Sequence, residues 1–203
     1  PLPPGPLLLI ANHVTAVDGA LVLYALPPSL RRHLAAAMSA EMLLDFRHAR
    51  GQRTWLHTAL APAAYWLLTA LFNVFPLPRL QGFRHSFAHA GRALDRGYSV
   101  LLFPEGHRSR SGLLQDFRPG IGLLAQQSRV PVLPIALLGL GTAPGQAGRA
   151  RSWFRSGRIQ IRLGAPIQLP DHASPSDWTT TLQAALLRLL THPGPPPAPP
   201  ASN

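Results

Sequence analysis

A histidine and an aspartate five residues apart, His13 and Asp18, lie near the start of the chain. The apolar run 7–11 before them predicts a buried strand, and the residues from Asp18 onward predict a helix. Thr15 and Asp18 have capping-box spacing, which puts Thr15 at the N-cap and His13 just before the helix. Asp18 can then hold one imidazole nitrogen and leave the other free to take a proton. The pair predicts a general base for a hydroxyl on the substrate, although a surface histidine and a helix-capping aspartate give the same spacing.

A second polar segment with the sequence FPEGHRSR, residues 103–110, follows a strand predicted at 99–103. Strand ends are where α/β proteins bind their ligands. Gly106 permits close backbone approach, and Arg108 and Arg110 offer guanidinium groups that can bind a phosphate. On this segment alone, the arginines could equally belong to a solvated turn.

Glu105 is an acid inside this basic loop, and two kinds of role are open to it. In a structural role it orients Arg108 or accepts hydrogen bonds from backbone N–H groups. In a functional role it holds a hydroxyl group or an arginine at an acceptor site.

The predicted strands and helices that position these residues alternate along the chain. This order favours an α/β fold with a mixed, mostly parallel central sheet flanked by helices. The predicted strands are 7–11, 34–39, 99–103, 132–138 and 158–163, and the predicted helices are 18–26, 82–96, 117–128 and 177–190.

No charged residue occurs between Arg53 and Arg79. The segment 54–78 is long enough to cross a bilayer, and its aromatic residues are of the kind enriched at membrane interfaces. We expect an apolar helical segment that associates with the membrane surface or re-enters it. A buried core helix is the alternative. A single crossing is disfavoured because it would separate His13 from the 103–110 segment by the membrane.

All 19 basic residues are arginines, and the formal net charge is +11. This charge favours anionic partners such as phosphorylated substrates or acidic lipid headgroups. Nucleic acid is not expected, because the aromatic residues cluster in the uncharged segment, away from most arginines. The absence of cysteine excludes disulfides, a thiolate nucleophile and cysteine-bound metal. No histidine–carboxylate cluster has metal-ligand spacing, so no metal is expected.

The length of 203 residues favours one domain, which we place at residues 1–192. Residues 193–203 are rich in proline and predict a disordered tail or linker. The chain begins at Pro1 and runs directly into an apolar stretch, so we expect a truncated N-terminus.

Four motifs follow one another in a specific order. They are Asn-His-x-x-x-x-Asp at 12–18, Phe-Pro-Glu-Gly-x-Arg-Ser at 103–109, Phe-Arg-Pro-Gly at 117–120 and Val-Pro-Val-Leu-Pro at 130–134. This set resembles the glycerolipid acyltransferases, which include the lysophosphatidic acid and glycerol-3-phosphate acyltransferases. The resemblance covers roughly residues 7–170.

The resemblance implies that His13 deprotonates an acceptor hydroxyl with support from Asp18. The hydroxyl would attack the thioester of acyl-CoA or acyl carrier protein directly, and no cofactor is implied beyond this co-substrate. Arg108 would bind the acceptor phosphate. The substrate-binding residues implied are Arg79, Glu105, Gly106, His107, Arg108 and Arg110.

Two of these positions depart from the family pattern. His107 stands where the family usually has threonine, which bears on the identity of the acceptor more than on the reaction. Arg79 matches a further arginine of the family only loosely, because its loop carries two prolines.

The expected reaction belongs to phospholipid biosynthesis, with 1-acylglycerol-3-phosphate as the first choice of acceptor. Another lysophospholipid or a lipid alcohol is the alternative acceptor, and a catalytically silent lipid-binding domain is the alternative to an enzyme. The expected partners are acyl-CoA or acyl carrier protein, a lysophospholipid and an anionic membrane surface. The expected location is the cytoplasmic face of the bacterial inner membrane.

Overall fold

The computed structural model describes residues 2–15, 17–39, 74–77, 83–109, 111–140, 159–168, 170 and 172–192. Its strands are β1 (Leu8–Ala11), β2 (Leu34–Ser39), β3 (Val74–Leu77), β4 (Ser99–Leu102), β5 (Val132–Leu138) and β6 (Gln160–Leu163). Its helices are α1 (Asp18–Ala25), α2 (Pro28–Arg31), α5 (Phe83–Asp95), α6 (Gly120–Ser128) and α7 (Pro175–Thr191).

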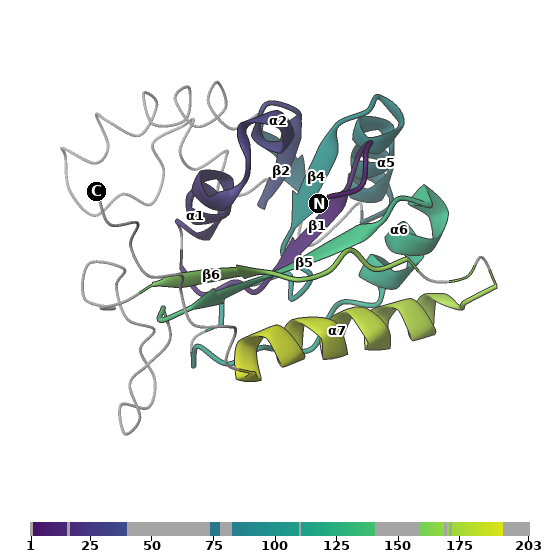
Figure 1. The fold of residues 1–203 in the computed structure, drawn as a ribbon. Helices are drawn as coiled ribbons and strands as arrows, with labels where there is room; N and C mark the ends of the chain where they lie inside the picture. The colour runs from purple at the N-terminus through teal and green to yellow at the C-terminus, as the bar shows by residue number, and fades with distance from the viewer. Residues whose placement is uncertain are drawn as a thin grey trace, which may run out of the picture.

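The six strands form one sheet in the order β3-β2-β4-β1-β5-β6. β1 lies between β4 and β5 and is parallel to both, with Leu8 opposite Val100 and Val132. Among these strands β6 alone runs antiparallel, beside β5, so the prediction of a mixed, mostly parallel sheet is confirmed. Because β1 and β4 are parallel neighbours, the chain leaves both strands at the same end of the sheet, so His13 and the segment 103–109 lie on the same side of it (Figure 1).

Helices cover both faces of this sheet, and side chains along each strand point alternately to the two layers. Leu8 and Ile10 belong to a buried cluster with residues of α5, α6 and α7. Leu9 and Ala11 belong to a second cluster that includes residues of α1. β1 is therefore buried on both faces, which explains why it is an unbroken apolar run.

The end of the uncharged segment is a strand and not the helix predicted for 54–78. Val74–Leu77 form β3, which pairs in parallel with β2 at one edge of the sheet. An edge position tolerates Pro76, because a proline cannot donate a hydrogen bond to the ladder. Residues 54–73 and 78 lie outside the described residues, as does the proline-rich segment 193–203.

Within the described residues, no helix combines the length and apolar character needed to cross a bilayer. The predicted membrane association of the uncharged segment therefore stays a prediction.

Two helices, α2 and α6, differ from the predictions where they begin. No helix was predicted directly after the helix 18–26, but Pro28 begins the short helix α2, where its missing N–H is not needed. α6 begins at Gly120 and not at residue 117. The backbone N–H of Arg118 instead donates to the carbonyl of Pro104, at 2.8 Å, so this part of the predicted helix belongs to a loop beside the site.

Candidate active site

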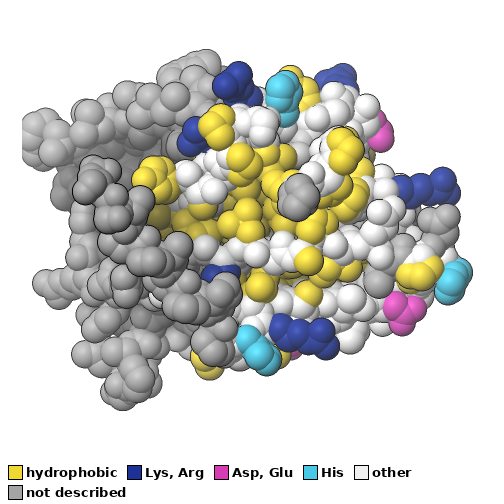
Figure 2. All heavy atoms as spheres, in the orientation of Figure 1, with side chains coloured by type: hydrophobic (Ala, Val, Ile, Leu, Met, Phe, Trp, Pro, Cys, Tyr) yellow, Lys and Arg dark blue, Asp and Glu magenta, His cyan; other side chains and the backbone are white. Residues whose placement is uncertain are grey.

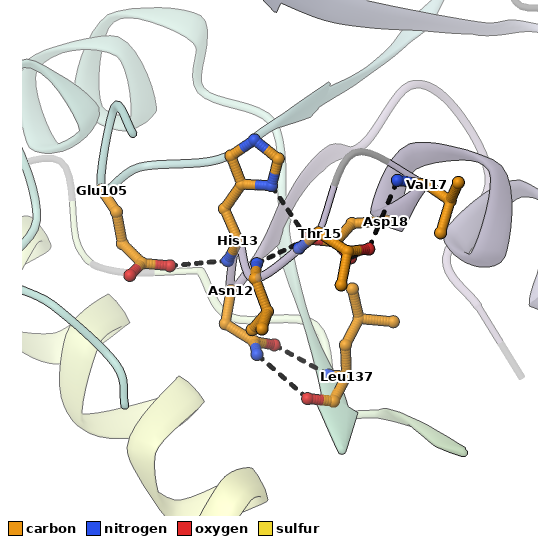
Figure 3. Close-up of polar contacts among 8 residues, drawn as sticks. Asn12, His13, Thr15, Val17, Asp18, Glu105 and Leu137 are labelled. Carbon is orange, nitrogen blue, oxygen red and sulfur yellow. Dashed lines mark hydrogen bonds and ion pairs between the residues drawn. The ribbon is translucent and has the colours of Figure 1, made fainter. Parts of the chain in front are cut away.

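His13 and Asp18 form a close pair between the end of β1 and the start of α1 (Figure 3). Nδ1 of His13 lies 2.8 Å from Oδ2 of Asp18. An ionised carboxylate only accepts hydrogen bonds, so Nδ1 carries a proton, and in the neutral imidazole Nε2 then has a free lone pair. Nε2 points away from the carboxylate in Figure 3, and the histidine side chain is 17% exposed. The arrangement can take a proton from a group that approaches Nε2.

Asp18 also shapes the loop that carries His13. Its Oδ2 accepts the backbone N–H groups of Val14 and Thr15, at 2.6 and 2.9 Å, and its Oδ1 accepts the Thr15 hydroxyl. The N-cap of α1 is Val17, without a side-chain cap bond, so the prediction of Thr15 as N-cap was wrong. The reason is that the fully buried carboxylate turns back into the loop, and the Thr15 hydroxyl bonds to it there.

Asn12 fixes the start of the same loop, a role that the sequence analysis missed. Its side-chain amide donates to the carbonyl of Leu137 at 3.0 Å and accepts from the N–H of Leu137 at 2.8 Å. The amide thus replaces a backbone group and continues the pairing of β1 with β5 (Figure 3). A polar residue directly after a buried strand was the available signal, because a buried amide must find hydrogen-bond partners.

Phe103, in the loop after β4, limits the orientation of the imidazole. It directly follows β4, and its ring stacks on the ring of His13 with centroids 4.3 Å apart and planes inclined by 22°. One face of the imidazole is therefore covered by an apolar side chain. The aromatic residue was visible in the sequence, but its contact depends on β1 and β4 being neighbours.

Glu105 is buried beneath the site, with an exposed fraction of 1%. Its Oε1 accepts the N–H of His13 at 2.7 Å, and its Oε2 accepts the N–H of Gln115 at 3.0 Å. Burial raises the pKa of Glu105 to about 7, and nearby Asp18 adds to this shift, although the two N–H bonds lower it. Of the roles open to Glu105, the observed bonds are those of the structural one.

The residues after Glu105 face solvent. Gly106, His107 and Arg108 are all exposed. Gly106 has φ +76°, and a Cβ atom there would lie 3.2 Å from Nε of Arg118, so the site favours glycine. Arg118 is exposed and belongs to the Phe-Arg-Pro-Gly motif at 117–120, but it was not predicted as a site residue.

Beside this loop lies an open groove of about 510 Å³. It is lined by Glu105, His107, Leu114, Gln115, Asp116, Phe117 and Arg118. Arg79 and Arg110 lie outside the described residues. The part of the chain with described positions contains no group of histidine and carboxylate side chains that could hold a metal ion.

Comparison with solved structures finds the same fold. The crystal structure of the 1-acyl-sn-glycerophosphate acyltransferase PlsC from Thermotoga maritima superposes with a TM-score of 0.63 and 18% sequence identity. The match covers 93% of this chain and 66% of that one.

Curated proteins match over shorter stretches. A chloroplastic 1-acyl-sn-glycerol-3-phosphate acyltransferase of Arabidopsis thaliana is 46% identical over 84 residues, which are 41% of this chain and 22% of the plant protein. A chloroplastic protein of the same description from Brassica napus is 36% identical over 83 residues, 39% of this chain and 24% of its own length. The matched stretch thus spans about a quarter of these relatives.

The model of one protein family covers most of the chain. The family described as Acyltransferase matches residues 1–138, which include both loops of the site and all of the strands that carry them. The chain therefore belongs to the Acyltransferase family.

Proposed function

We propose that this chain is the catalytic part of an O-acyltransferase. It transfers a fatty acyl group from acyl-CoA or acyl carrier protein to the free hydroxyl of 1-acylglycerol-3-phosphate, in phospholipid biosynthesis. The observation that carries this proposal is the His13–Asp18 pair, whose Nε2 is directed away from the carboxylate. Family membership and the relatives named for this acceptor support it.

In the proposed reaction, Nε2 of His13 takes the proton of the acceptor hydroxyl as its oxygen attacks the thioester carbonyl carbon. A carbon–oxygen bond forms and the carbon–sulfur bond breaks. The imidazolium then returns the proton to the leaving thiolate. Asp18 stabilises the imidazolium between these steps. No acyl group is attached to the protein, and no metal or further cofactor takes part, since a thioester is already activated.

The acceptor phosphate is bound by arginines of the loop after β4. Arg108 is exposed and precedes Ser109, whose backbone N–H donates to the carbonyl of His13. A guanidinium group can bind a phosphate through two parallel hydrogen bonds. We assign Gly106, His107 and Arg110 to the same subsite, with Arg79 as a further contributor. His107 would add an imidazole beside the phosphate, which can alter the choice among lysophospholipids.

The proposed setting is an anionic membrane surface, at the cytoplasmic face of the bacterial inner membrane, with no nucleic-acid partner. The net charge of +11 favours acidic headgroups, and each basic residue near such a surface contributes about 1 kcal/mol. Figure 2 shows hydrophobic side chains gathered in the middle of one face, with arginines around them. Tyr24 on α1 is 82% exposed, and Arg31 and Arg32 nearby in the chain are also exposed.

The test is a radiolabelled acyl-transfer assay on membranes that carry the wild type, His13→Ala or His172→Ala. Each is assayed with acyl-CoA and acyl carrier protein thioesters and a panel of lysophospholipids. His172 is an exposed histidine near the start of α7 and serves as the control. We expect transfer by the wild type and the control and a loss of about 10²- to 10⁴-fold in His13→Ala. No transfer to any acceptor by the wild type would contradict the proposal in favour of a lipid-binding domain.

A further inference from the structure

Glu105 belongs to the loop after β4, and its side chain bonds to the backbone of the loop after β1 and to the backbone of its own loop. One carboxylate oxygen accepts the N–H of His13, at 2.7 Å, and the other accepts the N–H of Gln115, at 3.0 Å. The side chain is 1% exposed. A substrate above the loop would therefore meet the exposed neighbours of Glu105 and not its carboxylate.

The backbone of His13 is held from both sides by the loop after β4. Its N–H donates to Glu105, and its carbonyl accepts the N–H of Ser109 at 2.7 Å. Arg108 lies between these two attachment points in the sequence. The backbone position of His13 is thereby coupled to that of the segment 105–109, which carries Arg108.

We propose that Glu105 is a positioning residue that fixes His13 relative to Arg108 and does not contact the substrate. This inference rests on the proposed function, because it assigns the base and the phosphate-binding group to these two residues. It replaces the substrate-binding role that the family resemblance implies for Glu105. A misplacement of the base by about 1 Å can lower an enzymatic rate by about 10²-fold.

Glu105→Gln tests this role with a side chain of the same size. A carboxamide has one oxygen that accepts hydrogen bonds and one nitrogen that only donates them. It can keep one of the two N–H bonds, but it places a donor against the other N–H. We expect kcat to fall about tenfold to a hundredfold. The KM values for donor and acceptor should change by less than about threefold, because no binding contact is lost.

The same substitution in a His13→Ala background separates positioning from other roles. If Glu105 acts only through His13, it has no imidazole to position in the His13→Ala protein. Adding Glu105→Gln to His13→Ala should therefore change the residual rate by less than about threefold. Adding Glu105→Gln to the His13→Ala protein should also leave its binding of the lysophospholipid unchanged. Co-sedimentation with vesicles measures this binding. The exposed Asp95→Asn on α5 is the control and should keep the wild-type kcat.

Four results would overturn the positioning role. A raised KM for the acceptor, or weaker lysophospholipid binding in the double variant, would show a contact with substrate. An equal loss of rate in both backgrounds, with a lower midpoint of thermal unfolding, would show a general effect on the fold. An unchanged kcat in Glu105→Gln would show that the two bonds do not matter for catalysis. A wild type that transfers no acyl group would instead contradict the proposed function itself.

Discussion

The loop that carries His13 and the loop that carries Arg108 lie at one edge of the sheet, but they bond to the protein in different ways. Asn12 and Asp18 are buried, and their side chains form hydrogen bonds with backbone groups of the protein. His107 and Arg108 are exposed to solvent. A proton acceptor must be held in one orientation, whereas a group that binds a ligand must stay open to it. Buried Glu105 connects the two loops.

Asp18→Asn should give the largest effect, because it changes the internally bonded loop. The carboxamide lacks the negative charge that stabilises an imidazolium, so kcat should fall by about 10²- to 10⁴-fold, as in His13→Ala. Charge-assisted bonds to two backbone N–H groups are also weakened. The free energy of unfolding should therefore fall by about 1.5–3 kcal/mol. Acyl-transfer kinetics and urea denaturation measure the two effects. A loss of kcat below about tenfold would refute the catalytic assignment of the pair.

Glu105, whose side chain links the loop after β4 to the loop of His13, should make stability depend on pH. Its pKa is raised from 4.5 to about 7, so between these values the folded protein binds more protons than the unfolded chain. The free energy of unfolding should therefore fall as pH rises from about 4.5 to about 7, by on the order of 2–3 kcal/mol.

Urea denaturation across this range measures the pH effect. In Glu105→Gln the free energy of unfolding should fall less over this pH range, by about the same 2–3 kcal/mol. The difference between the wild type and Glu105→Gln is therefore the contribution of Glu105 alone. Parallel pH curves for the two proteins would contradict the raised pKa.

Arg108→Ala should give the smallest effect, because it changes only the exposed loop. We expect the KM for the phosphorylated acceptor to rise about tenfold, with a smaller change in kcat and an unchanged midpoint of thermal unfolding. The loss should be smaller for an acceptor without a phosphate group. A loss of stability comparable to that of Asp18→Asn would erase the distinction between the two loops.

Most of the fold could be predicted because its strongest signals are local. The unbroken apolar runs at 7–11 and 132–138 read as buried strands, and both lie in the middle of the sheet. β3 could not be predicted in the same way. It has four residues, includes Pro76 and joins a longer uncharged stretch, and its strand conformation depends on pairing with β2.

The sequence by itself determined the functional groups of the candidate site: an imidazole and a carboxylate five residues apart, and a basic loop at a strand end. Residue types and short spacings suffice there, because His13 and Asp18 belong to one turn of chain. Tertiary structure decided how these groups are held. Phe103 on His13, Asn12 on Leu137 and Glu105 on the His13 backbone each join residues about 90 or more positions apart. Such contacts arise from the order and register of the strands, which cannot be read from local patterns in a single sequence.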